Sequence, residues 1–178
     1  IFDFEKYKQT KDKRKQLEHQ RRQLDHEISQ LESKVPNSIL NYPDPKPGFD
    51  RKKVLGVVCN LFKVKDERYY YAVEKAVGGK LYQIVVDTDE TAKQIKDCMN
   101  RRTTFIIMDK LQRHHFDETA LKNAKRLVGG DKVFAVKDLV EFDPKLKNVM
   151  DSIFSDTFIC ADVNDAKKVA FTENIKKK

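Results

Sequence analysis

The first part of the chain carries the heptad pattern of a coiled-coil helix. Residues 4–35 contain neither Pro nor Gly and are rich in Lys, Arg, Glu and Gln. Leucines recur in this segment at every seventh position, at Leu17, Leu24 and Leu31. If these leucines occupy the d positions of a heptad, Ile28 and Val35 fall at a positions. The pattern therefore predicts a coiled-coil arm over residues 1–35.

The predicted seam of this arm is apolar only towards its C-terminal end. The same register places Arg14 and Arg21 at a positions and Thr10 at a d position. At about 1.5 Å per residue the helix would be roughly 48 Å long, which is too long and too polar for a compact domain. We therefore expect a partner helix along the seam; a single solvated helix is the alternative.

A proline-rich segment separates the arm from the rest of the chain. Pro36 ends the helical pattern, and residues 41–48 contain three prolines. Neither a helix interior nor a central strand accommodates this spacing, because proline has no backbone N–H to donate. We expect residues 36–52 to form an extended connector.

From residue 53 onwards, short apolar runs alternate with helical patterns. Strands are predicted at residues 54–58, 81–86, 103–108, 133–136 and 157–161. Helices are predicted at residues 66–77, 88–100, 117–128, 144–154 and 164–171. Because strands separated by helices of about ten residues favour βαβ units, the sequence predicts an α/β fold. We expect a largely parallel or mixed sheet with flanking helices over residues 53–178.

Composition narrows the class of protein. The 178 residues are 39% hydrophobic and 36% charged, and their apolar runs fall far short of the ~20 residues that span a bilayer. Cys59, Cys98 and Cys160 are odd in number and widely spaced, which fits reduced thiols of an intracellular protein better than a zinc site. The chain opens on Ile1 without a secretory leader, and we interpret it as a piece of a longer protein.

The formal net charge of +8 favours an anionic partner, of which nucleic acid is the commonest. Ordinary solubilising charge explains the value equally well, because Asp and Glu are also abundant. Several basic residues fall near the connector or beside predicted strand ends, where together they would contact phosphates: Arg51, Lys52, Lys53, Arg101, Arg102, Lys110 and Arg113. Solvated loops are the competing interpretation.

The sequence offers no recognisable motif for catalysis. Residues 78–80 and 129–132 combine glycines with a lysine, but they follow helices and precede strands, the reverse of a phosphate-binding loop. His114 and His115 have no third metal ligand nearby in sequence. The acidic run at residues 87–90 lies where a strand turns into a helix, which favours capping. We predict no catalytic residue, no metal site and no binding of ATP to this chain.

Several short motifs follow one another in the order of a known family. They lie at residues 42–45, 49–51, 54–58, 78–88, 91–93, 104–107, 139–144, 158–160 and 165–171. The fourth group, from Gly78 to Thr88, resembles a GGRLYNVVVDT-like motif, and the likeness covers about residues 41–175. Together they resemble the hinge domain of the SMC (structural maintenance of chromosomes) family. The similarity looks greatest to the type-two SMC subunits of eukaryotic condensin.

The resemblance implies a hinge of two similar α/β subdomains, of which this chain would hold the first and the start of the second. It implies pairing with another SMC hinge, that of the type-four condensin subunit, and sequence-independent contact with DNA during chromosome condensation and segregation. In the family, ATP and Mg²⁺ belong to head domains at the far ends of the arms, so no cofactor is expected here. Such a protein would act in the nucleus and on chromosomes, and also in the cytoplasm.

The surface expected to meet the partner hinge centres on the glycine pair and the run that follows it. Because glycines allow close approach of two backbones, the predicted interface comprises Gly78, Gly79, Leu81 and Tyr82. A buried central strand after a helix end is the alternative for the apolar members. Two other classes of protein also fit the sequence: a small α/β enzyme with a helical oligomerisation arm, and a basic coiled-coil adaptor that binds RNA.

Overall fold

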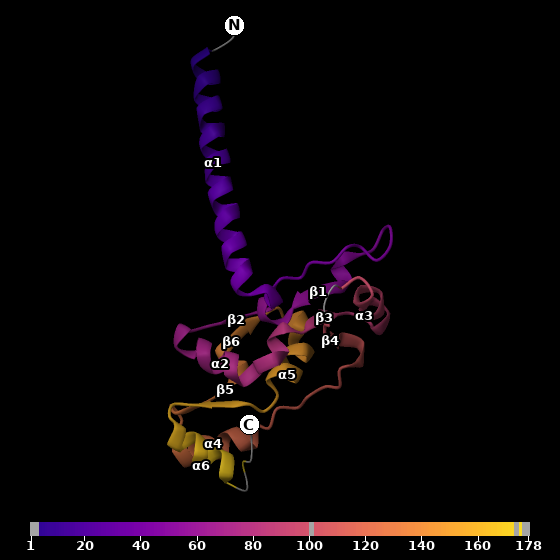
Figure 1. Cartoon of the computed structure of the whole chain (residues 1–178). Helices are drawn as coiled ribbons and strands as arrows, with labels where there is room; N and C mark the ends of the chain where they lie inside the picture. Colours follow the sequence, from indigo (N-terminus) through magenta and orange to yellow (C-terminus); the bar gives the residue numbers. More distant parts are fainter. Residues whose placement is uncertain (1–3, 100–101, 173–174, 176–178) are drawn as a thin grey trace. The chain divides into compact units, whose positions relative to one another are not determined.

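The structure, a computed structural model, describes residues 4–99, 102–172 and 175 (Figure 1). The chain divides into two compact units, Ile1–Ile39 and Leu40–Lys178. The first is helical and the second mixes helices with small sheets. The assignment of residues 36–52 to a separate connector stays a prediction.

The first unit is one long helix, α1 (Phe4–Lys34), followed by a 3₁₀ turn at Pro36–Ser38. None of its described residues is buried, and the leucines of the heptad are all exposed. Arg14 and Arg21 pair along the helix with Glu18 and Asp25, at 3.4 and 3.9 Å. The long helix is therefore confirmed, while the partner along its seam stays a prediction.

The central sheet of the second unit has three strands in the order β1-β3-β4. β1 (Val54–Val57) runs antiparallel to β3 (Ile84–Val86), and β3 runs parallel to β4 (Phe105–Ile107). β3 consists of one isoleucine and two valines, and all three side chains are buried. This composition is typical of a central strand that is covered on both faces. A mixed α/β arrangement is thus confirmed.

The expectation was a largely parallel or mixed sheet, and the central sheet is mixed. Two further two-stranded ladders, which the sequence did not predict as separate sheets, lie outside it. β2 (Phe62–Val64) pairs antiparallel with β6 (Val140–Phe142), and β5 (Val133–Ala135) pairs antiparallel with β7 (Phe158–Cys160). Pattern reading missed β2 and β6 because each has three residues with a charged one, Lys63 or Glu141, in the middle. Such runs are too short to show a period of two.

Five helices of the second unit begin where a polar residue or a 3₁₀ turn precedes them: α2 (Tyr70–Val77), α3 (Asp89–Lys96), α4 (Glu118–Val128), α5 (Lys147–Phe154) and α6 (Val163–Phe171). The side chains of Thr88, Asp117 and Asp162 accept hydrogen bonds from backbone N–H groups at the starts of α3, α4 and α6. α4 and α6 lie side by side (Figure 1).

One predicted strand was partly wrong. Residues 81–86 were expected to be extended throughout, but Gly78–Tyr82 forms a 3₁₀ turn and only Ile84–Val86 is a strand. The turn follows α2 directly, and Gly78 caps the end of that helix. Leu81 therefore belongs to the turn, although its side chain points into the core.

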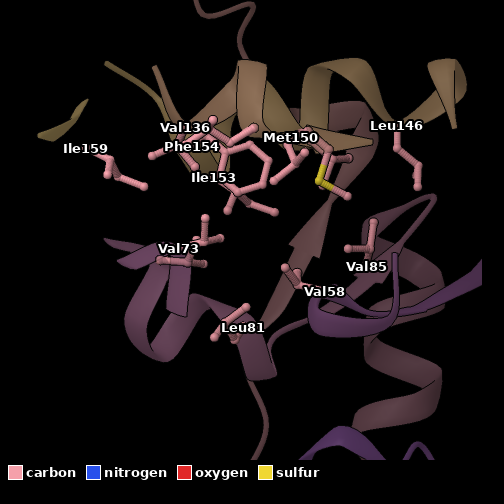
Figure 2. Packing of buried hydrophobic residues seen from close by; sticks show 14 residues of the cluster. Val58, Val73, Leu81, Val85, Val136, Leu146, Met150, Ile153, Phe154 and Ile159 are labelled. Atoms are coloured by element: carbon pink, nitrogen blue, oxygen red, sulfur yellow. The ribbon is translucent and has the colours of Figure 1, made fainter. Parts of the chain in front are cut away.

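The largest core cluster packs the buried face of α5 against residues of α2, β3 and the turn Gly78–Tyr82. Figure 2 shows Met150, Ile153 and Phe154 of α5 directed towards Val73 and Val58. The ring of Phe154 meets that of Phe62 edge-on, with centroids 5.3 Å apart. A second cluster buries Tyr42 and Phe49 against Val57 and Ile84, so the proline-rich segment contributes two core residues to the second unit.

Within the described part of the chain, no helix combines the length and the apolar character needed to cross a bilayer.

Candidate functional site

The turn Gly78–Tyr82, called here the diglycine turn, begins at the C-terminus of α2. Gly78 has φ 58°, and its N–H donates a hydrogen bond to the carbonyl of Glu74. Residues with a Cβ rarely adopt this left-handed region, so Gly78 is required by the backbone conformation of the chain itself.

Gly79 differs from its neighbour, because neither its backbone angle nor a contact in the described part of the chain requires a glycine there. Its φ does not fall in the left-handed region, and a Cβ added to it meets no described atom within 4 Å. Neither conformation nor space within the chain excludes a larger residue here. A glycine at such an exposed position leaves the backbone open to close approach by another molecule.

The other two residues of the predicted interface point in different directions. Leu81 is 8% exposed and packs in the main core, with Val77 and Val85 among the members of its cluster. Tyr82 is 44% exposed. Three of the four predicted interface residues, Gly78, Gly79 and Tyr82, are therefore exposed. The fourth, Leu81, is buried and anchors the turn to the core.

A hollow of about 280 Å³ lies beside β4, next to the diglycine turn; we call it the β4 hollow. It is lined by Lys80, Gln83, Phe105, Ile106, Ile107, Lys110, Leu111, Ser152 and Ile153. All three residues of β4 line this hollow, and β4 is the outer strand in the order β1-β3-β4, so one of its edges faces away from β3. No strand in the described part of the chain pairs with this edge.

Two lysines stand at the β4 hollow. Lys80 Nζ donates hydrogen bonds to the carbonyls of Ser152 and Ile153, both at 3.3 Å, where α5 ends. Lys110 Nζ lies 3.1 Å from Asp89 Oδ1, and Lys93 Nζ lies 2.9 Å from the other oxygen of the same carboxylate. Hydrogen bonds from Lys93 and Lys110 lower the pKa of Asp89.

The predicted DNA-contacting residues are not gathered on one patch. The N–H of Asp87 donates to the carbonyl of Lys53 at 3.0 Å, and the N–H of Asp109 donates to the carbonyl of Asp87 at 3.1 Å. Lys53 and Lys110 therefore lie at the same end of the central sheet, with carboxylates between them. Burial acts to raise the pKa of Asp87, but hydrogen bonds from Thr91 and Thr88 outweigh it and lower this pKa.

The remaining predicted cations have varied surroundings. Arg51 is engaged by the proline-rich segment: its Nε donates to Asp44 Oδ1 at 2.7 Å, and its guanidinium lies 5.1 Å from the ring centroid of Tyr42. Lys52 is exposed in the 3₁₀ turn Arg51–Lys53. Arg102 precedes β4, at the opposite end of that strand from Lys110, and Arg113 is exposed after it. Arg101 lies outside the described residues.

The described residues do not bring together groups for metal binding. Over residues 4–99, 102–172 and 175, no three His, Cys, Asp or Glu side chains are grouped so as to hold a metal ion. His114 Nε2 lies 3.3 Å from Asp156 Oδ1, and His115 is exposed. Lys132, after the second glycine pair, lies 3.6 Å from the buried carboxylate of Asp165. These contacts fit structural roles.

Sequence reasoning missed the β4 hollow. The sequence suggests only a phosphate-binding loop for Lys80, which the order of elements excludes, and only a contact with DNA phosphates for Lys110. The one local signal was the position of Lys80 directly after the glycine pair. Its partners on α5 are more than seventy residues away in sequence, so no local pattern shows the contact.

Comparison with known proteins places these features in a family. Residues 51–170 match the family described as SMC proteins Flexible Hinge Domain. Structural maintenance of chromosomes protein 2-1 of Arabidopsis thaliana is 39% identical over 146 residues, 81% of this chain and 12% of that protein. Structural maintenance of chromosomes protein 2 of Homo sapiens is 37% identical over 145 residues, 80% of this chain and 12% of that protein. The chain thus spans about an eighth of the length of these relatives.

Solved structures agree on the fold. The SMC hinge domain of Geobacillus stearothermophilus, crystallised as an asymmetric dimer, matches 92% of this chain and 68% of that chain with a TM-score of 0.61 at 22% identity. The Pyrococcus furiosus Smc hinge domain with an extended coiled coil matches 92% of this chain and 56% of that chain, with a TM-score of 0.57 at 26% identity. The mixed α/β fold of the second unit is therefore a fold found in SMC hinges.

Proposed function

Because this chain belongs to the SMC flexible hinge family, we propose that it is a pairing module that joins a type-two SMC subunit of condensin to a second SMC hinge. Similarity to curated type-two proteins supports the choice of subunit. The partner we propose is the hinge of the type-four condensin subunit. The role is one of assembly, without a catalytic residue in this chain.

Gly79 carries this proposal. It is an exposed glycine whose lack of a side chain is required neither by φ nor by space within the chain. The simplest physical reason for a glycine at such a place is a second backbone that approaches it closely. No strand among the described residues pairs with the outer edge of the neighbouring β4, so this edge offers the same partner a place to add a strand.

The test compares two glycines with matched surroundings. Gly130 also lies outside the left-handed region, and a Cβ added to it meets no described atom within 4 Å. We expect Gly79→Glu to abolish pairing with a type-four hinge in size-exclusion chromatography with light scattering, while Gly130→Glu leaves pairing intact. Both variants should keep the wild-type melting temperature. Pairing of Gly79→Glu at wild-type affinity would remove the main support for the proposal.

The wider setting is part of the same proposal. The parent protein would hydrolyse ATP with Mg²⁺ in head domains, and this hinge would bind neither. It would act in the nucleus and on chromosomes, and in the cytoplasm, during chromosome condensation and segregation. Calorimetry with Mg-ATP on the 178-residue chain is expected to show no saturable binding. Binding that is lost on changing Lys80 or Lys132 would favour the enzyme alternative.

A second proposed role is sequence-independent contact with DNA. It is supported by the net charge of +8 and by exposed cations such as Lys52, Arg102 and Arg113. The acidic neighbours of Lys53 and Lys110 reduce the contribution of those two residues. We therefore propose weak binding that depends on a few phosphates rather than a continuous basic surface.

A further inference from the structure

The β4 hollow combines three properties that select one kind of occupant. The first is a strand edge. Phe105, Ile106 and Ile107 line the hollow, and β4 is the outer strand of its sheet, so an extended segment in the hollow can lie beside the β4 backbone. An extended chain gains hydrogen bonds at such an edge, and its alternate side chains face the lining.

The second property is an apolar floor. Leu111 and Ile153 line the hollow beside β4, and Phe105 supplies an aromatic ring. Apolar side chains of an added strand would leave water on contact with these residues. The floor alone would accept any apolar segment and would not discriminate between partners.

The third property is charge. Lys80 and Lys110 line the hollow, and none of its described lining residues is acidic. Lys80 donates only to neutral carbonyls at the end of α5, where the helix dipole supplies about half a negative charge. Lys110 shares the carboxylate of Asp89 with Lys93, so two ammonium groups face one carboxylate. The hollow therefore keeps an excess of positive charge.

From these properties we infer that the β4 hollow is a charge-selective docking groove for an extended segment of a partner hinge that carries a carboxylate between apolar residues. Lys80 and Lys110 receive the carboxylate, and the edge of β4 pairs with the segment. This inference rests on the proposed pairing function and names the chemistry of the partner.

The selectivity has a physical consequence for the choice of partner. A segment with a carboxylate gains a charge-assisted hydrogen bond in the groove, while one with a lysine at that place is repelled by two ammonium groups. The charge of +8 on this chain adds to the repulsion between two copies. The groove thus favours pairing with an acidic second hinge over pairing with itself.

Lys93 provides a matched control for Lys110. Both contact Asp89, but only Lys110 lines the hollow. We expect Lys110→Gln to weaken binding of the 178-residue chain to a type-four SMC hinge by about tenfold at low salt, the size of one charge-assisted hydrogen bond. Lys93→Gln should change affinity less than twofold. Raising the salt concentration should reduce the difference between wild type and Lys110→Gln.

A second pair of variants examines Lys80. Lys80→Gln should weaken binding, and Lys80→Arg should restore most of it, because the guanidinium keeps the charge. The melting temperature of each variant is measured as well. A lowered melting temperature reports loss of the contact between Lys80 and α5, while weaker binding at an unchanged melting temperature reports loss of the groove contact. Unchanged affinity in both Lys110→Gln and Lys80→Gln, or equal weakening by Lys93→Gln, overturns the inference while leaving pairing itself in place. A wild-type chain that pairs with no SMC hinge overturns the proposed function as well.

Discussion

The backbone N–H of Asp117 donates a hydrogen bond to Asp156 Oδ1 at 3.0 Å, across 39 positions of the chain. Asp117 caps α4, and Asp156 follows the end of α5, so this bond ties the start of one helix to the turn after another. His114 Nε2 lies 3.3 Å from the same oxygen. One carboxylate thereby holds the extended segment that leads from β4 to α4.

Replacing Asp156 with Ala should destabilise the chain by about 1–3 kcal/mol, because the partly buried N–H of Asp117 would lose its acceptor. Asp156→Asn keeps an acceptor oxygen and should cost less than half as much. Urea unfolding followed by circular dichroism measures both. Equal losses in the two variants would show that charge, not the acceptor, matters at this position.

The start of α6 should make stability depend on pH in the acid range. Asp162 accepts hydrogen bonds from the N–H groups of Asn164 and Asp165, at 2.7 and 2.9 Å, and the bond from Asp165 is the main cause of its lowered pKa. A lowered folded-state pKa means that the contribution is complete above the unfolded value of about 3.9 and is lost as pH falls through the folded value.

Asp162→Asn tests this dependence, because asparagine caps a helix without titrating. The difference in unfolding free energy between wild type and Asp162→Asn should be constant from about pH 7 to 5 and should shift against the wild type below about pH 4. Urea titrations at a series of pH values measure it. Parallel curves over the whole range would contradict the assignment.

The arm should be only marginally helical by itself. Arg14 and Arg21 occupy presumed core positions, and their pairs with Glu18 and Asp25 stabilise an isolated helix by only about 0.3–0.5 kcal/mol each. A peptide of residues 1–35 is expected to show low helicity by circular dichroism at micromolar concentration. Arg14→Leu/Arg21→Leu should give helicity that rises with concentration. Strong helicity independent of concentration in the wild-type peptide would refute the heptad register.

Binding to DNA should be weak and sensitive to salt. If about four phosphates are contacted, log affinity should fall against log salt with a slope of about −3.6 for duplex DNA. Lys52→Glu/Lys53→Glu should weaken binding in fluorescence anisotropy, and so should Arg102→Glu/Arg113→Glu. Lys122→Glu/Lys125→Glu on α4 changes the net charge equally and serves as the control. An affinity that does not change with salt, or an equal loss of affinity in all three double variants, would leave the hinge as a pairing module only.

Elements with a strong local signal were predicted well from sequence. The α1 helix was recognised, and capping was expected in the run at residues 87–90, where Thr88 caps α3, because spacing and capping are local properties. The hinge-like succession of motifs is confirmed by the family match over residues 51–170. The last two residues of the 3₁₀ turn, Leu81 and Tyr82, were predicted as strand, since they adjoin a buried β-branched run.

The β4 hollow was beyond sequence reasoning for a different reason. Lys80 reaches α5 only because the core brings Leu81 and Ile153 into one cluster. That proximity results from tertiary packing, and no regular spacing of residues in the sequence indicates it. The same holds for the shared contact of Lys93 and Lys110 with Asp89, of which only the first pair has helical spacing.

The pairing of β2 with β6 also has a consequence for how the chain is made. Val64 lies opposite Val140, so β2 cannot pair with β6 until three helices and β3, β4 and β5 have been synthesised. At about 5–20 residues per second, roughly 4 to 15 seconds pass on the ribosome between the two strands. Throughout that time Phe62 lacks the ring of Phe154. The nascent hinge therefore exposes an unpaired strand edge and an uncovered aromatic ring until its last third has emerged.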